Sequence, residues 1–200
     1  MNKRSVYGVG IYEKGKYINA EKHKKCYDLW HAMLRRCYCK SELTRRSQYE
    51  DCEVCEEWLY FSNFEKWYNK QKYAYKENYQ LDKDILCKDN KIYSPKNCVL
   101  VPREINMLLV KRNKCRGDLP IGVSIDKKYK HCRKYRVACS NGNGKCVRLG
   151  VYDTIEEAFN VYKQYKENVI KEKSQEYYDK GLINYKTYKA LMKYEVNIDD

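Results

Sequence analysis

Residues 81–106 read LDKDILCKDNKIYSPKNCVLVPREIN, and this stretch decides how the first half of the chain folds. Apolar residues predict short strands at Leu81–Leu86 and Val99–Val101, with the turn-forming sequences DNK and SP between them. Pro102 suits the first position of a helix, where its missing N–H is harmless, and this helix is predicted to run through Leu108. The predicted order is strand, long loop, strand and helix.

The preceding residues carry a helical pattern. Apolar residues recur at helical spacing over residues 22–39, namely at Tyr27, Trp30, Leu34 and Cys37. Residues 1–20 are predicted to form an arm with at most one strand, and residues 40–50 a loop. Cys52–Trp58 is predicted to turn into a second helix with an aromatic face. We expect the tryptophans of both helices to pack in a core rather than to stack on bases.

The second half of the chain has the pattern of a small sheet followed by a helix. Three short strands are predicted, at Ile121–Ile125, Tyr135–Cys139 and Cys146–Leu149. Asn141–Gly144 (NGNG) is a strong turn signal between the last two strands. Thr154 is predicted to cap a helix, with Glu157 three residues later completing a capping box. A further short helix is expected within residues 173–195.

These patterns predict an α+β protein of two units. The first unit spans residues 1–110 and contains helices followed by the strand–loop–strand–helix segment. Residues 111–118 (KRNKCRGD) are charged and lack an apolar repeat, so they are predicted to form a basic linker. Residues 119–200 form the second unit, with the sheet, its helix and a C-terminal helix.

The charge of the chain favours a polyanionic partner. Among 200 residues, 41 are Lys or Arg and 27 are Asp or Glu, which gives a formal net charge of +14. Such a surface attracts nucleic acid through Coulomb forces and counterion release. No stretch approaches the roughly 20 apolar residues of a membrane span, and Met1–Tyr12 lacks the apolar core of a signal peptide. A membrane partner is therefore not expected.

The 11 cysteines are an odd number, which favours reduced thiols in a cytosol over a complete disulfide framework. Cys52 and Cys55 have the C-x-x-C spacing of zinc ligands, and Cys37 and Cys98 could complete a tetrahedral site. A second C-x-x-C pair is missing, so buried thiols are favoured over zinc.

The segments Leu81–Asp84, Asn90, Tyr93–Cys98 and Pro102–Asn106 together resemble the finger of phage HNH homing endonucleases. The resemblance covers most of residues 22–112. It implies a ββα-metal finger that nicks or cleaves DNA in the cytoplasm of a phage-infected bacterial cell. Such a reaction needs a metal ion to stabilise charge on the phosphate and a base to activate water. Mg²⁺ or Mn²⁺ is the expected ion, because the implied ligands are oxygen atoms.

The resemblance assigns roles to three residues of the finger. It implies that Asp82 and Asn106 bind the metal, and that Asn97 braces the loop and orients the catalytic base. The family has its general-base histidine where this chain has Lys83. A lysine with an ordinary pKa near 10.4 is protonated at neutral pH and cannot accept a proton.

Three interpretations of this departure follow. Lys83 could contact a phosphate in place of catalysis. Asp84 could act as the base. Alternatively, His23 or His31 could fold over the site. The candidate catalytic residues are thus Lys83, Asp84 and Asn97.

Residues 120–162 resemble the plant ethylene-responsive-factor (APETALA-type) DNA-binding domain, which also occurs in phage homing endonucleases. The matching segments are Ile121–Val123, Lys134–Ala138, Leu149–Thr154, Glu156–Phe159 and Tyr162. The resemblance implies a three-stranded antiparallel sheet that packs on one helix and enters the major groove of double-stranded DNA. The basic residues on or beside the predicted strands are the expected DNA contacts: Arg133, Lys134, Arg136, Lys145 and Arg148.

Two functions of different class therefore compete. One is a metal-dependent HNH-type endonuclease whose second unit selects the site. The other is a non-catalytic DNA-binding or regulatory protein on a degenerate HNH scaffold, which the lysine at position 83 favours. RNA binding is a third and weaker hypothesis, since aromatic and basic residues interleave along the chain. The sequence predicts no oligomeric state.

Overall fold

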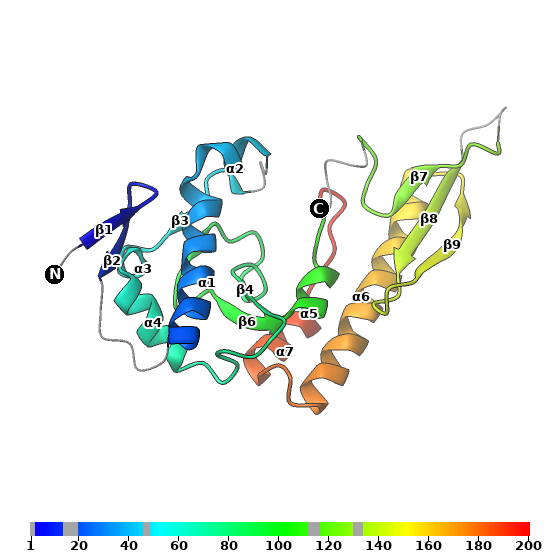
Figure 1. Ribbon diagram of the computed structural model, residues 1–200. Helices are drawn as coiled ribbons and strands as arrows, with labels where there is room; N and C mark the ends of the chain where they lie inside the picture. Colours follow the sequence, from blue (N-terminus) through cyan, green and yellow to red (C-terminus); the bar gives the residue numbers. More distant parts are fainter. Residues whose placement is uncertain (1–2, 14–19, 46–48, 112–116, 130–133) are drawn as a thin grey trace. The chain divides into compact units, whose positions relative to one another are not determined.

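The fold is mixed α+β and divides into two compact units, Met1–Pro102 and Arg103–Asp200. The computed structural model describes residues 3–13, 20–45, 49–111, 117–129 and 134–200 (Figure 1). The division lies at Pro102 rather than within 111–118, where the linker was predicted. Residues 112–116 of that linker lie outside the described part of the chain.

In its described residues, the first unit combines a hairpin with four helices. Its elements are β1 (Lys3–Val6), β2 (Gly10–Glu13), α1 (Ala20–Tyr38), α2 (Lys40–Arg45), α3 (Glu56–Leu59) and α4 (Phe61–Asn69). The predicted helix over residues 22–39 is confirmed as α1, because its apolar stripe fills the core: Trp30, Met33 and Leu34 are fully buried. Trp58 is also fully buried, as expected.

Two expectations for the first 50 residues were wrong. The N-terminal arm forms two paired strands instead of at most one, and Gly10 of β2 packs against Trp30 of α1. A side chain at position 10 would lie 2.4 Å from Leu34, which explains the glycine. Residues Lys40–Arg45 form α2 rather than a loop. This helix buries no residue, so it carries no apolar pattern from which to predict it.

Two small sheets complete the first unit. β4 (Tyr79–Asp82) pairs with β6 (Val99–Pro102) in antiparallel register, with Asp82 opposite Val99. Two further strands, β3 (Glu53–Val54) and β5 (Ile92–Tyr93), pair in parallel and were not predicted. Pro102 ends β6 instead of starting the helix, and α5 (Arg103–Leu108) begins one residue later, in the second unit.

The second unit contains the predicted three-stranded antiparallel sheet. Its order is β7 (Val123–Ile125), β8 (Tyr135–Ser140) and β9 (Cys146–Tyr152), with β8 in the centre. The helix α6 (Ile155–Asp179) covers one face of this sheet, as Figure 1 shows. Along β8, buried and exposed residues alternate, so Tyr135, Val137 and Cys139 face the helix.

The start of α6 agrees with the prediction. The hydroxyl of Thr154 accepts a hydrogen bond from the backbone N–H of Glu157 at 3.2 Å, which satisfies one free amide of the first turn. The helix runs to Asp179, further than its apolar pattern indicated, and α7 (Tyr185–Met192) follows within the range predicted for a short helix.

Candidate nucleic-acid interface and the loop after the fourth strand

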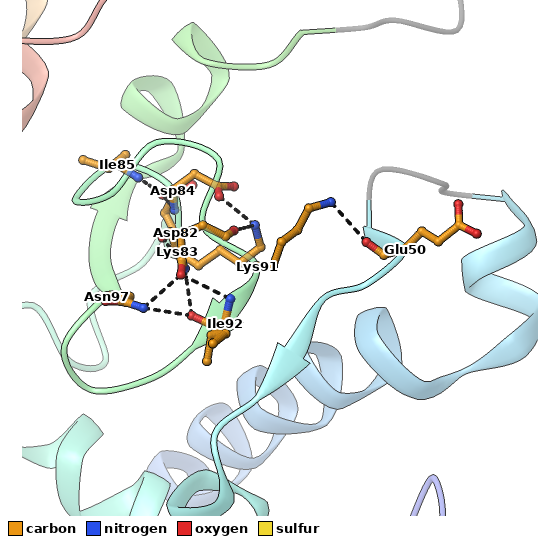
Figure 2. Close-up of polar contacts among 9 residues, drawn as sticks. Glu50, Asp82, Lys83, Asp84, Ile85, Lys91, Ile92 and Asn97 are labelled. Atoms are coloured by element: carbon orange, nitrogen blue, oxygen red, sulfur yellow. Dashed lines mark hydrogen bonds and ion pairs between the residues drawn. The ribbon is translucent and has the colours of Figure 1, made fainter.

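The loop that follows β4 begins with a tight turn around Asp82. Oδ1 of Asp82 accepts hydrogen bonds from the backbone N–H groups of Asp84 and Ile85, both at 2.8 Å (Figure 2). The strand therefore ends at Asp82 rather than continuing to Leu86, because this carboxylate draws the next amides out of the ladder. Asp82 thus has a structural role that its position in the sequence did not indicate.

Lys83 lies inside this loop, with only 7 % of its side chain exposed. Its ammonium donates to Oδ1 of Asp84 at 2.6 Å and to the backbone carbonyl of Asn90. The ring of Tyr93 lies 5.9 Å away from the same ammonium. Lys83 therefore ties the first turn of the loop to its return limb.

Two asparagines brace the loop from within. The side-chain amide of Asn90 donates to the carbonyls of Lys83 at 2.9 Å and Ile92 at 2.8 Å. Asn97 donates to Oδ1 of Asn90 at 2.9 Å (Figure 2). Lys91 donates to the carbonyl of Glu50 at 3.1 Å and so links the loop to the segment before β3. The loop is held by side chains more than by strand pairing.

The protonation of this loop argues against a catalytic base at position 83. Burial lowers the pKa of Lys83, but the hydrogen bond and charge of Asp84 outweigh it, and the net effect raises the pKa. Burial raises the pKa of Asp82, and the amide hydrogen bonds that its carboxylate accepts offset this only in part. The depressed lysine pKa that a general base would need is therefore not found.

The remaining residues of the expected catalytic set lie on other elements. Asn106 lies on α5 in the second unit, whereas Asp82 lies in the first. His23 bonds to the hydroxyl of Tyr12 at 3.1 Å and to Glu65 at 3.2 Å. His31 packs against the ring of Tyr7 with centroids 5.0 Å apart. Both histidines of α1 thus contact the N-terminal hairpin.

The cysteines of the first unit are free thiols. Burial raises the pKa values of Cys37, Cys52, Cys55 and Cys98, and that of Cys37 reaches about 12. High pKa values keep these thiols protonated, whereas zinc binds thiolates. Within the described ranges, no group of three or more His, Cys, Asp or Glu residues is placed to hold a metal ion.

The face of the β7–β8–β9 sheet opposite α6, which we name the outer face, carries two arginines. Arg136 lies opposite Ser124 and Val151, and Arg148 lies opposite Ala138. Both arginines are exposed. A β-bulge between Val137 and Ala138 shifts the register so that the two arginines share this face. Two of the five expected DNA contacts, Arg136 and Arg148, therefore lie on the same face of the sheet.

Two carboxylates that the sequence analysis missed pair with basic residues of this region. Nη2 of Arg148 donates to Oδ2 of Asp126 at 3.1 Å, and Asp126 is only 3 % exposed. Lys134 forms an ion pair with Asp153. These pairs join residues distant along the chain, so no local pattern signals them. Arg136 has no side-chain partner among the residues described, and Lys145 is exposed in the turn after β8. Arg133 lies outside the described residues.

No protein-family model, curated protein or solved structure matches this chain. In the part of the chain described, no helix is both long and apolar enough to cross a bilayer.

Proposed function

We propose that this protein binds double-stranded DNA through the outer face of its three-stranded sheet. The observation that carries the proposal is the exposed guanidinium of Arg136 at the centre of this face, without an intramolecular partner among the described residues. A two- or three-stranded ribbon fits the major groove, where Arg can donate two hydrogen bonds to a guanine edge. The net charge of +14 supports the same partner.

Arg148 would act as a second, pre-oriented contact. Its side chain is 52 % exposed, and one N–H of the guanidinium donates to the buried carboxylate of Asp126. The pair restrains the direction of the side chain while the other N–H groups stay available, which lowers the entropic cost of binding. Lys134 and Lys145 flank the strands and suit phosphate contacts.

The composition of the outer face favours duplex DNA over single-stranded RNA. Its described strand residues are Ser124, Arg136, Ala138, Ser140, Cys146, Arg148 and Val151. Sheets that bind single strands stack unpaired bases on aromatic rings, and these positions hold no aromatic side chain. The tyrosines of the sheet, Tyr135 and Tyr152, belong to the core beneath it.

The test is a fluorescence-anisotropy titration with a duplex selected from a random library and with a random-sequence duplex. Arg136→Ala should weaken binding to the selected duplex about tenfold or more, since a bidentate contact to guanine is worth about 1–3 kcal/mol. Arg136→Lys should keep the salt dependence but lose sequence preference. Lys189→Ala, which removes an exposed charge from α7, is the matched control and should change affinity little. Equal effects of Arg136→Ala and Lys189→Ala would reject this interface.

A second candidate function, metal-dependent nicking of the bound duplex, is favoured by one observation. Asn97 braces the loop through Asn90, which is the role that the HNH resemblance implies for it. We expect any such activity to be slow, because the ammonium of Lys83 is buried and protonated and cannot act as the base. The assay is nicking of a supercoiled plasmid with Mg²⁺ or Mn²⁺.

The variants for this assay are Asp82→Ala, Asn106→Ala and Lys83→His. Loss of wild-type nicking in both alanine variants, together with faster nicking by Lys83→His, would support a finger with an impaired base. Binding without nicking, in the wild type and in Lys83→His, would leave a non-catalytic DNA-binding protein.

A further inference from the structure

The second unit contains a groove of about 740 Å³. Its lining comes from α5 and the residues after it, the two residues Ile121 and Gly122 before β7, the end of β8 with the turn into β9, and α6. β7 pairs only with Tyr135–Val137, so the groove lies beside the end of β8 that β7 leaves uncovered. The backbone of Gly122 receives the last hydrogen bond there, from the N–H of Ala138 at 3.0 Å. The groove therefore exists because β7, the first strand of this sheet, is short.

Lys166 of α6 lines this groove and is the least exposed of its basic residues, at 9 %. Other lysines of α6 and of its C-terminal cap are paired with carboxylates: Lys163 with Glu167, and Lys173 and Lys180 with Glu176. Among the described residues, Lys166 has no such carboxylate partner. A buried ammonium without a counterion is costly, because it has left water without replacing its hydration.

The surroundings of Lys166 also indicate that its amine has no counterion. Burial lowers the pKa of Lys166, and the nearby thiol of Cys139 opposes this only in part. Burial in turn raises the pKa of Cys139, so this thiol is protonated and supplies no full negative charge. Among the described residues, therefore, no carboxylate or thiolate pairs with the amine of Lys166.

The rim of the groove adds positive charge. Arg103, Lys111 and Lys145 line it with Lys166, and Glu104 is the one acidic residue of the described lining. Lys111 is itself bound to Asp200 at 2.9 Å. Arg103 and Lys145 are exposed. The half-exposed side chains of Met107 and Val110 supply an apolar wall.

We propose that this groove binds the phosphate group of a ligand, with Lys166 as the cation at its floor and Lys145 and Arg103 at its rim. A phosphate would provide the counterion that Lys166 lacks and would accept several charge-assisted hydrogen bonds at once. A nucleotide and a phosphate of a nucleic-acid strand share this chemistry, and the apolar wall suits the base of either. The proposal does not rest on the proposed DNA interface, because Arg136 and Arg148 are not part of the groove lining. Lys145 is the residue that both proposals use.

The test uses pyridoxal 5′-phosphate as the probe and pyridoxal, which lacks the phosphate, as its matched control. The uncharged amine of Lys166 attacks the aldehyde carbon, water leaves, and added borohydride reduces the resulting imine to a stable secondary amine. Peptide mass spectrometry then gives the labelling rate at each lysine. We expect pyridoxal phosphate to label Lys166 about tenfold faster than pyridoxal, because one charge-assisted contact between its phosphate and the rim residues Lys145 and Arg103 would hold the aldehyde beside the amine of Lys166. Equal rates for the two probes would overturn the proposal.

Two single variants and one double variant separate phosphate binding from mere reactivity of the amine. Lys145→Ala keeps Lys166 but should reduce the preference for the phosphorylated probe severalfold. Lys163→Ala, one turn earlier on α6 and outside the groove lining, should leave that preference unchanged. A preference that survives Lys145→Ala and Arg103→Ala together would overturn the proposed site.

Competition identifies the source of the phosphate. Protection of Lys166 by deoxyadenosine monophosphate, but not by deoxyadenosine or by an oligonucleotide without terminal phosphate, would indicate a free nucleotide. Protection by that oligonucleotide or by a duplex would indicate a strand. Protection by none of these phosphates would reject the proposal, while duplex binding measured by anisotropy would still test the outer face independently.

Discussion

The ammonium of Lys83 lies 2.6 Å from the carboxylate of Asp84, and the pair links adjacent residues at the first turn of the loop after β4. The same ammonium also donates a hydrogen bond to the backbone carbonyl of Asn90. The residue that departs from the HNH pattern is thus an internal brace of the loop. Its buried, protonated side chain is poorly placed both to accept a proton and to reach a phosphate.

Lys83→Met should destabilise the protein by about 1–2 kcal/mol at neutral pH, because the carbonyl of Asn90 and the half-exposed Asp84 lose a charged donor. The pKa of Lys83 is raised, so the stabilisation is complete below the ordinary lysine pKa and is lost only as pH rises through the higher folded value. Urea unfolding from neutral to mildly alkaline pH should therefore give a constant difference from wild type. A difference that shrinks near pH ~8 would indicate a depressed lysine pKa, contrary to this prediction.

Asp82 offers a test of the turn that ends β4. Asp82→Ala removes the acceptor of two amide hydrogen bonds and should cost about 1–3 kcal/mol. Asp82→Asn keeps an oxygen at that place and removes a partly buried charge, so it should be at least as stable as wild type at neutral pH.

The difference in stability between wild type and Asp82→Asn should depend on pH in one direction. Because burial raises the pKa of Asp82 in the folded state, its contribution is most favourable below the unfolded pKa and is lost as pH rises through the folded pKa. The advantage of Asp82→Asn should therefore disappear below about pH 4. Thermal unfolding across this range measures it, and an Asp82→Asn variant as unstable as Asp82→Ala would show that the charge itself is required.

Gly122, the residue before β7, packs closely against the ring of Tyr162 on α6. A Cβ at Gly122 would lie 2.0 Å from the ring of Tyr162, and the φ angle of +78° disfavours any other residue. Gly122→Ala should cost about 2–4 kcal/mol. Gly144→Ala is the control: its φ is +80° but nothing lies within 4 Å, so only the backbone strain of about 1–2 kcal/mol applies. Equal losses in denaturant unfolding would contradict the packing argument.

The reactivity of the cysteine thiols tests whether the protein binds a metal ion. Among the described cysteines, alkylation of the native protein near neutral pH should first modify the exposed Cys87 and Cys146 and the half-exposed Cys39, because a hydrogen bond with Ser41 lowers the pKa of Cys39. The buried Cys37 and Cys98 should stay protected, since burial raises the pKa of both. Peptide mass spectrometry gives the rates, and a chelator should not change them. Faster modification of Cys52 and Cys55 after chelation would reveal a bound metal and favour the zinc alternative.

Much of the second unit could be predicted because its signals are local. The NGNG turn, the alternation along β8 and the Thr154 cap each depend on residues a few positions apart. The loop after β4 was predicted less well, since Asp82, Lys83 and Asn90 are polar residues whose roles depend on folding back on one another. Polar patterns in a sequence do not distinguish a solvated loop from one held by its own side chains.

The sequence by itself determined the α+β class, the helix α1, the β6 strand, and the order of sheet and helix in the second unit, because hydrophobic periodicity and turn chemistry act over short range. Only the tertiary structure decided which charges remain available. It paired Arg148 with Asp126 and Lys134 with Asp153, buried Lys83 and Lys166, and left Arg136 exposed. Burial and ion pairing depend on residues brought together from distant positions, and they set the charge that a partner would meet.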